Sequence, residues 1–571
     1  MNNAISMKFP ACRRLGVSPL WLTLLGGLPS FAAHAAGAGT PNAGTILQQM
    51  QPVAPPSVPS RDIGLSVERP ASGMPPSSQS FRVDRIEITG NTAIDTPTLH
   101  ALVADSEGKD LTMPDLGELA ARITDYYHAH GYPLARAIVP AQTMRSGVLR
   151  FDIIEARYGK IGIDNQSRVR DGLLQATLGG LQAGAVVTQA ELDHSLLLLS
   201  DIPGLAVNAT LKPGTAVGTS DLQVDVSSTP MAIGNMTVAN NGDRYSGRVR
   251  VEATASLVDP LHHGDVLSIS GLSSGRGLNY GRVSYDTLLN GHGTRVGGAW
   301  SALDYRLTGA LSPLGAHGNA QVGSLWAKQP LIRSRRLSLY WQIQYDHLTL
   351  NDDIDANGIA NRRHLDNVTT SLFGDVRDGL LVGGVTTWNA SWTYGHVGFD
   401  DAVAQASDAA TTNTQGGYSR WNLGLARLQG LDANDALYVS VAGQWSSSNL
   451  DPSQQMIATG PNAVRAYDVN SVSGGTAYLF TIELRHTFAQ AWLGQWQAIA
   501  FFDGAHVRVN KTPLAAGPNV ANLGGAGVGL TWAGPWHMNA SATLAAPIGG
   551  RSTLVSDVAS ARVWLQLSKG F

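Results

Sequence analysis

An arginine in a loop and an aspartate on a later strand are the residues of this sequence best suited to a specific chemical role. Arg465 lies in residues 460–468, a stretch rich in Gly, Pro and Asn that predicts a loop. Asp503 lies in a later segment, where it shares one face of a predicted strand with Gln497 and Phe501. Because a guanidinium presents a planar fork of donors that matches a carboxylate, we predict an ion pair between Arg465 and Asp503.

Two more charged residues, Glu483 and Arg485, follow the loop on the next predicted strand and point to the same side as Asp503. We expect them to join the network. Breaking a buried pair leaves one charge without a partner and costs roughly 3–5 kcal/mol, so such a pair pins the loop in place. The alternative interpretation is a structural salt bridge that has no role in function.

The composition restricts the class of protein to which the chain belongs. Charged residues make up 15% of the 571 residues and the net charge is −3, so the chain has no basic footprint for nucleic acid. The one cysteine, Cys12, excludes a disulfide framework and a metal site built from cysteines. The sequence contains no phosphate-binding loop, G-x-S-x-G elbow or H-E-x-x-H motif, so we expect neither an enzyme nor a cofactor.

Two weaker patterns are better explained by structure than by ligand binding. Residues 353–358 resemble the start of a calcium loop, but the twelfth position is His364 rather than Glu, which favours an acidic external turn. His128 and His130 end a predicted helix with no third ligand nearby, where they complement the helix dipole. No metal site is predicted.

The N-terminus has the pattern of a secretory signal. Basic residues precede an apolar stretch at residues 15–28, and Ala33-His34-Ala35 fits a small-x-small cleavage site, which predicts a signal peptide over residues 1–35. A membrane anchor is the weaker alternative, because prolines and glycines interrupt the apolar stretch. No later window has the uninterrupted apolar length of a membrane helix, so a membrane location would require a closed barrel.

Two different segments follow the signal. Residues 36–50 contain a short predicted helix from Thr45 to Met50. Residues 51–80 are rich in proline and predict an extended linker that forms no core of its own.

Residues 81–228 predict two similar globular modules. In residues 81–158, the periodicity gives the order strand, helix, helix, strand, strand, and residues 159–228 repeat that order. Modules of this kind present sheet edges to which an extended peptide can add a strand. The alternative is that they serve only as spacers.

Residues 229–571 alternate between apolar and polar side chains, which predicts roughly sixteen antiparallel strands and a transmembrane barrel with a wet lumen. A soluble β-sandwich would alternate too. The signal peptide and the Trp and Tyr residues near segment ends favour the membrane, where amphipathic rings settle at the headgroups. The last strand ends in Phe571, a terminal residue typical of outer-membrane barrels.

Taken together, these parts resemble the two-partner secretion outer-membrane transporters, the haemolysin and adhesin activator family related to the barrel-assembly superfamily. In that family the modules are periplasmic polypeptide-transport-associated (POTRA) domains, and a long loop with a Val-Arg-Gly-Tyr motif folds back into the barrel. Here Val464, Arg465 and Tyr467 match, whereas Ala466 replaces the Gly. The resemblance implies an inward-folding loop over about residues 449–475. If position 466 requires a positive φ, alanine there would be strained.

The family also has a motif on a barrel strand, and Phe501, Asp503 and Ala505 fit it fully. The resemblance implies that the Arg465 loop is anchored to Asp503 inside the lumen. It also implies that the short helix in residues 36–50 is a plug.

The implied function is a pore that exports one large unfolded partner exoprotein, a haemolysin, adhesin or related protein, from the periplasm to the cell surface. The POTRA domains would recognise the N-terminal secretion domain of that partner. Outer-membrane lipid, the barrel-assembly machinery and periplasmic chaperones would be further partners. An insertase that assembles other barrels is the alternative, although that family usually carries more than two modules, and a passive porin would need no modules at all.

Overall fold

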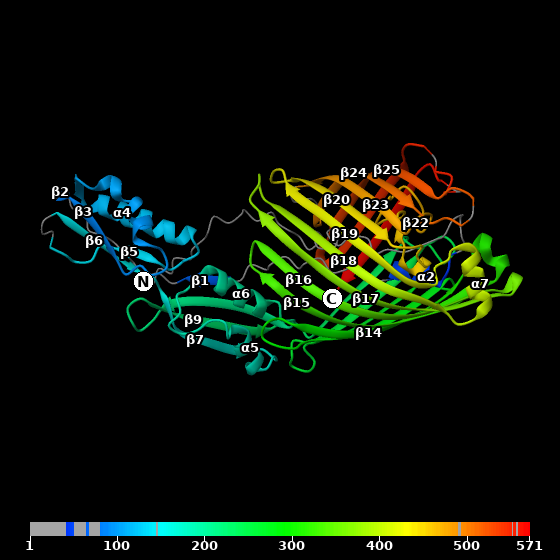
Figure 1. Cartoon of the computed structure of the whole chain (residues 1–571), viewed down its shortest axis with the longest axis horizontal. Helices are drawn as coiled ribbons and strands as arrows, with labels where there is room; N and C mark the ends of the chain where they lie inside the picture. The colour runs from blue at the N-terminus through cyan, green and yellow to red at the C-terminus, as the bar shows by residue number, and fades with distance from the viewer. Residues whose placement is uncertain are drawn as a thin grey trace. The chain divides into compact units, whose positions relative to one another are not determined.

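The computed structural model describes residues 41–50, 64–67, 80–143, 147–488, 493–514, 516–550, 552–555 and 558–571. The chain divides into two compact units, one mainly of residues 60–229 and one mainly of residues 230–571 together with the segment that contains the short N-terminal helix (Figure 1). The predicted signal peptide, residues 1–35, lies outside the described residues, as does most of the predicted linker.

The first module has a three-stranded sheet of order β3-β6-β5, in which β3 runs parallel and β5 antiparallel to β6. Its long helix α4 starts at a capping box between Thr112 and Asp115, and Leu116, Ile123 and Tyr127 then face the core at helical spacing. This is the predicted β-α-α-β-β order, with an additional pair between β2 and β4. The bounds are β2 Ser80–Val83, β3 Arg85–Thr89, α3 Thr96–Ala101, η1 Ala104–Ser106, β4 Lys109–Thr112, α4 Met113–Ala129, β5 Arg136–Ile138 and β6 Val148–Ile154.

The second module repeats the order, but its sheet has a fourth strand. The sheet order is β1-β8-β9-β7, and β1 comes from Gly64–Val67, within the segment predicted as a structureless linker. The prediction missed β1, because four residues are too few to show a readable alternation of apolar and polar side chains. Unpaired backbone groups on the edge of β8 accept the segment as a strand. The other bounds are β7 Arg157–Gln166, α5 Asp171–Leu178, α6 Gln189–Ser200, β8 Leu205–Pro213 and β9 Thr219–Ser228.

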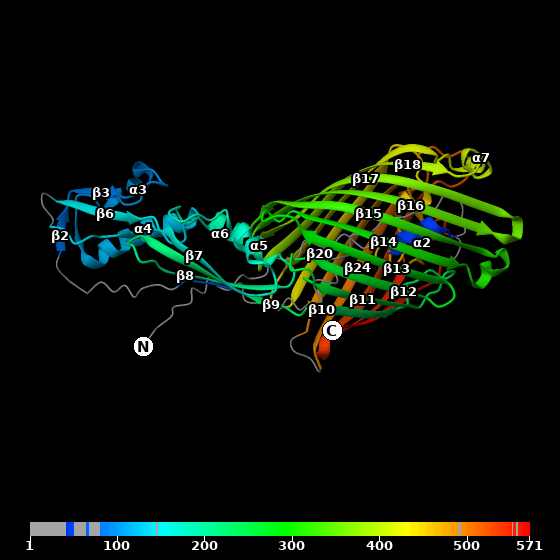
Figure 2. The ribbon, with the colours of Figure 1, turned by 90° about the horizontal axis from the view of Figure 1, so that it is seen from below.

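Among the described residues, sixteen antiparallel strands close into one barrel, which confirms the predicted fold class and strand number. Strands that follow one another in sequence are neighbours in the wall, as the colour gradient around the barrel shows (Figure 2). The bounds are β10 Ala232–Ala239, β11 Arg250–Val258, β12 Val266–Ser273, β13 Leu278–Leu288, β14 Arg295–Arg306, β15 Ala316–Arg333, β16 Leu337–Ile354, β17 Ile359–Asp378, β18 Gly384–Phe399, β19 Gly416–Gly430, β20 Asp435–Ser446, β23 Thr476–Thr487, β24 Gln495–Arg508, β25 Val520–Ala533, β26 Met538–Pro547 and β27 Arg562–Gly570.

The alternation along the strands separates an apolar outer face from a polar inner face. On β23, Glu483 is buried on the inner face whereas Ile482 and Leu484 are exposed on the outer face. On β24, Asp503 is likewise buried and Phe502 exposed. Successive side chains of a strand point to opposite sides, so the inner residues meet one another and the outer residues meet lipid.

The seam between the first and last strands is short. β10 pairs with β27 from Asn235↔Gly570 to Ala239↔Gln566. Phe571 extends the seam by one residue, because its N–H donates to the Gly234 carbonyl at 3.0 Å and its carbonyl accepts from the Gly234 N–H at 2.8 Å. The phenyl ring lies against Gly234, where a side chain would collide with it. Phe571 therefore closes the wall and takes no part in the lumen.

The remaining helices of the barrel unit are short. None of the helices in the described residues has the length and hydropathy needed to cross a membrane. Their bounds are α2 Ala43–Met50, η2 Gly309–Leu314, η3 Asp355–Asn357, α7 Ala402–Thr411, η4 Pro452–Gln454 and η5 Pro535–His537.

A buried carboxylate stabilises the first module. Glu155 is 8% exposed and accepts hydrogen bonds from the N–H groups of Thr92 and Ala93 and from the Tyr127 hydroxyl, each at 2.8 Å. Burial by itself raises the pKa of Glu155, but the hydrogen bonds from Thr92, Ala93 and Tyr127 outweigh burial and hold the pKa below its usual value. The folded module therefore prefers the ionised form.

We expect Glu155→Gln to destabilise the first module by about 1–3 kcal/mol at pH 7, because the amide cannot accept all of these bonds. A lowered pKa adds stability that is complete above the unfolded pKa, about 4.3, and is lost as the pH falls through the folded pKa. The loss should therefore shrink in acid. Hydrogen exchange of residues 80–155 in the full-length protein measures it, with the exposed Glu118→Gln as the control.

Candidate functional site

The connection between β20 and β23, residues 447–475, folds into the barrel and is called the inner loop below. It contains η4, the two-stranded pair of β21 (Met456–Ile457) with β22 (Ser473–Gly474), and a bridge between Thr459 and Val464. Val464, Ala466 and Tyr467 are buried in one apolar cluster with Phe501 and other inward-facing wall residues. The inner loop is thus packed like a core segment on the inner face of the wall.

Arg465 contacts the wall through every polar part of its side chain. Its Nε and Nη2 donate to the two oxygens of Asp503 at 2.8 and 2.7 Å, and its Nη1 donates to Glu483 at 2.7 Å. Its backbone N–H donates to Asp503 at 3.1 Å, and its guanidinium stacks 3.4 Å from the centre of the Phe501 ring. Asp503 also accepts from the Thr481 hydroxyl at 3.0 Å. The structure therefore brings the sequence-predicted pair into direct contact.

Glu483 extends this cluster to a second arginine. Its other carboxylate oxygen accepts from Nε of Arg485 at 2.8 Å, and Arg485 stacks 4.5 Å from the centre of the Tyr438 ring. Two carboxylates thus face two guanidiniums, all with side chains at most 12% exposed. Removing one member would leave a buried charge unbalanced.

Ala466 stands at the position where the Val-Arg-Gly-Tyr motif has glycine, and its backbone and neighbours allow alanine there. Ala466 is absent from the non-glycine residues of positive φ in the described chain, so its backbone is unstrained. Gly525 on β25 faces it, and a side chain there would come within 2.8 Å of the Ala466 Cβ. Because Gly525 leaves that space open, Ala466 packs directly on the wall. Ala505, the last residue of the wall motif, is partly buried and packs against the same cluster.

Contacts that the sequence did not predict anchor the far side of the loop tip. Asp468 accepts from Arg248 at 2.8 and 3.1 Å and also from Arg562 on β27. The indole N–H of Trp564 on β27 donates to the Arg465 carbonyl at 2.8 Å. The loop tip therefore bridges β23 and β24 to the final strand of the barrel.

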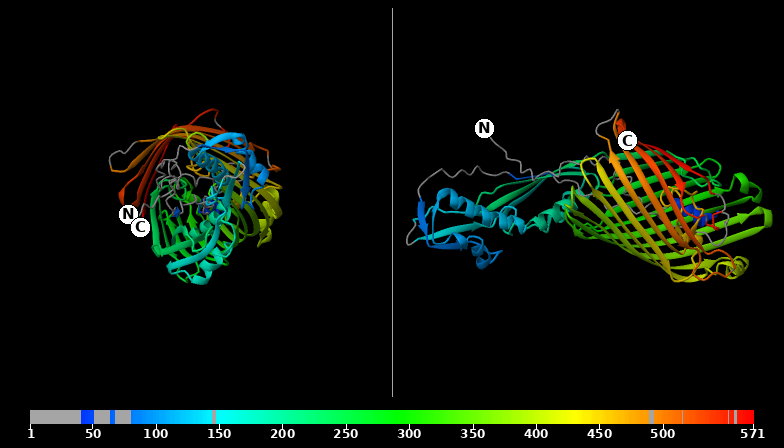
Figure 3. Two further views of the ribbon diagram at one scale, coloured as in Figure 1. Left: turned by 90° about the vertical axis from the view of Figure 1, so that its left-hand side faces the viewer. Right: turned by 90° about the horizontal axis from the view of Figure 1, so that it is seen from above.

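The helix α2 lies inside the barrel, where it appears in dark blue in Figure 2 and Figure 3. Asn42 caps it by accepting from the Thr45 N–H at 3.1 Å, and Ile46 and Leu47 are buried against inward-facing wall residues. A side chain at Gly44 would come within 2.8 Å of the Ser453 nitrogen in η4. The glycine thus permits close packing of α2 on the inner loop.

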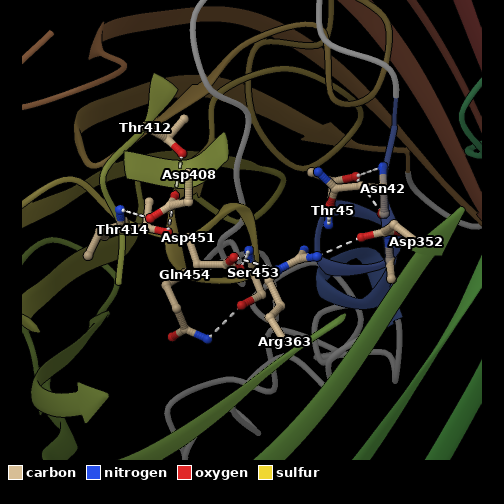
Figure 4. Close-up of polar contacts among 12 residues, drawn as sticks. Asn42, Thr45, Asp352, Arg363, Asp408, Thr412, Thr414, Asp451, Ser453 and Gln454 are labelled. Carbon is tan, nitrogen blue, oxygen red and sulfur yellow. Dashed lines mark hydrogen bonds and ion pairs between the residues drawn. The ribbon is translucent and has the colours of Figure 1, made fainter. Parts of the chain in front are cut away.

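A second buried ion cluster joins α2, the inner loop and the wall (Figure 4). Arg363 on β17 donates to Asp451 of the inner loop and to Asp352 of β16, both at 2.7 Å. Asp352 also accepts from the Ala43 N–H at the start of α2 and from the Tyr305 hydroxyl, both at 2.6 Å. No sequence motif contains Arg363. The alternation of side chains along the predicted strand was the one signal available for this residue, because that alternation predicts an inward position.

A cavity of about 450 Å³ remains beside Leu47 of α2, lined by polar wall residues that include Arg282, Asp346 and Arg420. Elsewhere in the described residues, no group of three or more His, Cys, Asp or Glu side chains is arranged to hold a metal ion. Asp353, at the start of the calcium-like pattern, instead pairs with Arg362 at 2.7 Å.

Known proteins share this architecture. Residues 218–532 match the family described as haemolysin secretion/activation protein ShlB/FhaC/HecB, and residues 81–156 match the ShlB-type POTRA domain. The heme/hemopexin transporter protein HuxB of Haemophilus influenzae is 23% identical over 545 residues, which cover 93% of this chain and 95% of HuxB. The outer membrane transporter CdiB of Dickeya dadantii is 23% identical over 493 residues, covering 84% of each chain.

A solved structure, CdiB from Escherichia coli, superimposes with a TM-score of 0.68 at 20% identity and covers 88% of this chain and 93% of its own. At that identity the superposition supports the fold alone. The fold is thus shared over most of both chains.

The Arg465–Asp503 contact can be measured by a double-mutant cycle. We expect Arg465→Ala and Asp503→Ala each to lower the free energy of unfolding by roughly 3–5 kcal/mol, because each leaves a buried charge without its partner. The double variant should lose less than the sum of the two. Urea unfolding of the detergent-solubilised protein tests this, and strictly additive losses would show that the two side chains are not coupled.

The adjacent residues Arg363 and Arg362 provide a test variant and a matched control. Arg363 points into the lumen, whereas Arg362 pairs with Asp353. We expect Arg363→Met to accelerate amide exchange in Ala43–Met50 by roughly tenfold or more, because charge-assisted hydrogen bonds contribute about 1.5–3 kcal/mol each. Arg362→Met should leave that exchange unchanged. Hydrogen exchange of the full-length protein measures both, and equal effects would contradict a specific role of Arg363.

Proposed function

This chain belongs to the haemolysin secretion/activation protein family of two-partner secretion transporters, and from that premise we propose that it exports one large exoprotein that enters the barrel unfolded from the periplasm. Members of the family are outer-membrane transporters, not enzymes. The exoprotein would cross the lumen as an extended chain, and folding on the outside would give the movement its direction.

The presence of the inner loop and α2 inside the barrel is the observation that carries this proposal. A barrel of about sixteen strands is wide enough to enclose an aqueous channel, but here the inner loop and α2 occupy that space. A passive porin would gain nothing from this arrangement. Segments that are held by ion pairs and hydrogen bonds, and not by covalent links, suit a pore that stays closed until its substrate arrives.

The Arg465 network would act as the anchor of the closed state. Its contacts run from the loop tip to two adjacent strands, β23 and β24, so they fix the loop against one sector of the wall. Release of these contacts leaves buried charges without partners. The free energy that this requires makes spontaneous opening rare. In the open state, the charged side chains would face water and the passing polypeptide.

The modules would recognise the exoprotein through strand addition. Among the described strands, β5 pairs with β6 alone, so its other side lies at the edge of the sheet, where the Ala137 N–H donates to the Thr124 hydroxyl at 3.0 Å. An extended peptide can satisfy such an edge with its own backbone, while side chains of alternate residues supply specificity. The secretion domain of the exoprotein is the segment that we expect to bind there.

The decisive experiment is secretion of a co-expressed candidate exoprotein, taken from the neighbouring gene, by the wild type and by Arg465→Ala. We expect Arg465→Ala to reduce secretion strongly while the barrel still reaches the outer membrane, because a loop without its anchor has no defined place on the wall and obstructs the path of the exoprotein. Arg508→Ala, which removes an exposed arginine from the same strand as Asp503, should secrete normally.

Two results would contradict the proposal. Normal secretion by Arg465→Ala would make the ion pair purely structural. Failure of unrelated outer-membrane barrels to assemble in cells without this protein, with no secretion defect, would favour an insertase.

A further inference from the structure

The lumen cavity beside α2 lies apart from the Arg465 network. Its wall side is formed by residues of β13 to β19, whereas Arg465 pairs with residues of β23 and β24. Leu47 of α2 and Gln454 of the inner loop complete the lining. A cavity of about 450 Å³ holds a ligand of drug-like size, which corresponds to a few residues of an extended polypeptide.

The lining of this cavity carries more positive than negative charge. Its cations are Arg282, Lys328 and Arg420, and its carboxylates are Asp286 and Asp346. Asp286 is already paired with Arg295, which does not line the cavity, at 2.5 Å. A cleft in which one sign of charge predominates concentrates ligands of the opposite sign. The charge of the lining therefore favours an anionic ligand.

Arg420 presents donors that can hold such a ligand. Its Nη1 donates to the Gln454 carbonyl at 2.9 Å, whereas its Nε is buried and has no hydrogen-bond partner in the described structure. A buried donor without a partner is costly, and a carboxylate beside Nε would remove that cost. Nε and Nη2 form the side of a guanidinium that binds the two oxygens of a carboxylate, as Arg465 binds Asp503. Because Gln454 holds Nη1, this side of Arg420 is oriented before a ligand binds.

A second buried atom without a partner shows how long the ligand is. The side-chain oxygen of Asn389 lines the same cavity and accepts no hydrogen bond in the described structure. Thr393 lies opposite Arg420, and Asn389 is four residues before Thr393 on β18. At about 3.3 Å per residue of strand, the two positions are about 13 Å apart. An extended polypeptide of about four residues spans this distance, and a small free anion does not.

We propose that the cavity binds an acidic segment of the exported exoprotein, with a carboxylate on Nε and Nη2 of Arg420 and a backbone N–H on the side-chain oxygen of Asn389. This inference rests on the proposed function, because the exoprotein is the source of the segment. Rings of the lining, Trp326 and Phe373, offer apolar surface to the neighbouring side chains. The site thus combines a charged anchor with contacts that suit a peptide.

The position of the cavity suits a segment that arrives before the barrel opens. Asp286 lies near the end of β13 at Leu288, and the alternating direction of the strands brings that end to the side of the barrel where β10 begins. The chain enters the barrel from the periplasmic modules at β10. Because Gln454 of the inner loop orients Arg420, the site is complete while the inner loop is in place. The acidic segment therefore docks in the closed barrel.

Peptide binding to the full-length protein in detergent tests the site. The probes are dye-labelled tetraglutamate and its uncharged counterpart tetraglutamine, measured by fluorescence anisotropy. We expect the wild type to bind tetraglutamate about tenfold or more tightly than tetraglutamine, because hydrogen bonds to an ionised carboxylate are roughly twice as strong as neutral ones. Arg420→Gln should lose this preference. Arg427→Gln should keep it, because Arg427 lies on the same strand but pairs with Asp378 and does not line the cavity. Equal affinities of the wild type for the two peptides would overturn the proposal.

Hydrogen exchange tests the part that the inner loop plays. Tetraglutamate at about a hundred times its dissociation constant should slow amide exchange in residues 453–457 about tenfold or more, because the ligand binds only while Gln454 orients Arg420. Unchanged exchange would contradict a site that includes the inner loop. Free acetate at the same concentration should not displace tetraglutamate, and displacement would assign the cavity to small anions instead of a polypeptide.

These measurements need no export, so they separate this inference from the proposed function. Preference for tetraglutamate in a protein that secretes no candidate exoprotein would contradict the proposed function alone. Secretion by a protein that binds both peptides equally would contradict the acidic site alone.

Discussion

Charged side chains inside the barrel require partners of opposite charge, and the resulting ion pairs connect the inner loop, α2 and the wall. Arg465 is balanced by Asp503 and Glu483, and Arg363 by Asp352 and Asp451. A lone charge in such surroundings is costly, and each pair is stable only while both partners hold their positions. The loop therefore depends on the wall for its place, and the wall depends on the loop for neutrality.

The width of the barrel explains why these segments lie inside it. With about sixteen strands, inward side chains alone do not reach across the lumen, so the inner loop and α2 take the remaining space. The two are held differently. The inner loop continues at both ends into barrel strands, β20 and β23, whereas the described element that follows α2 in the chain is β1 of the second module. Apolar burial and a few hydrogen bonds retain α2, which makes it the more easily released segment.

Local periodicity in the sequence was sufficient to predict most of the helices and strands. Alternation with a period of two placed Glu483, Arg485 and Asp503 on one face, because successive side chains of a strand must point to opposite sides. The helical spacing of α4 and the order of both modules followed from similar local periodicity. β1 was missed, because four residues carry little pattern and their strand conformation comes from the edge of β8, to which they pair.

By itself, the sequence determined the class of fold, the number of barrel strands and the inward direction of the Arg465 partners, since these depend on local alternation and motif residues. The tertiary structure alone decided that Arg363 joins α2 to the inner loop, that Asp468 meets Arg248 and Arg562, and that Gly525 makes room for Ala466. Those contacts join residues that lie far apart in the chain. Their pairing is fixed only when the barrel closes around the folded loop, and no local pattern contains that information.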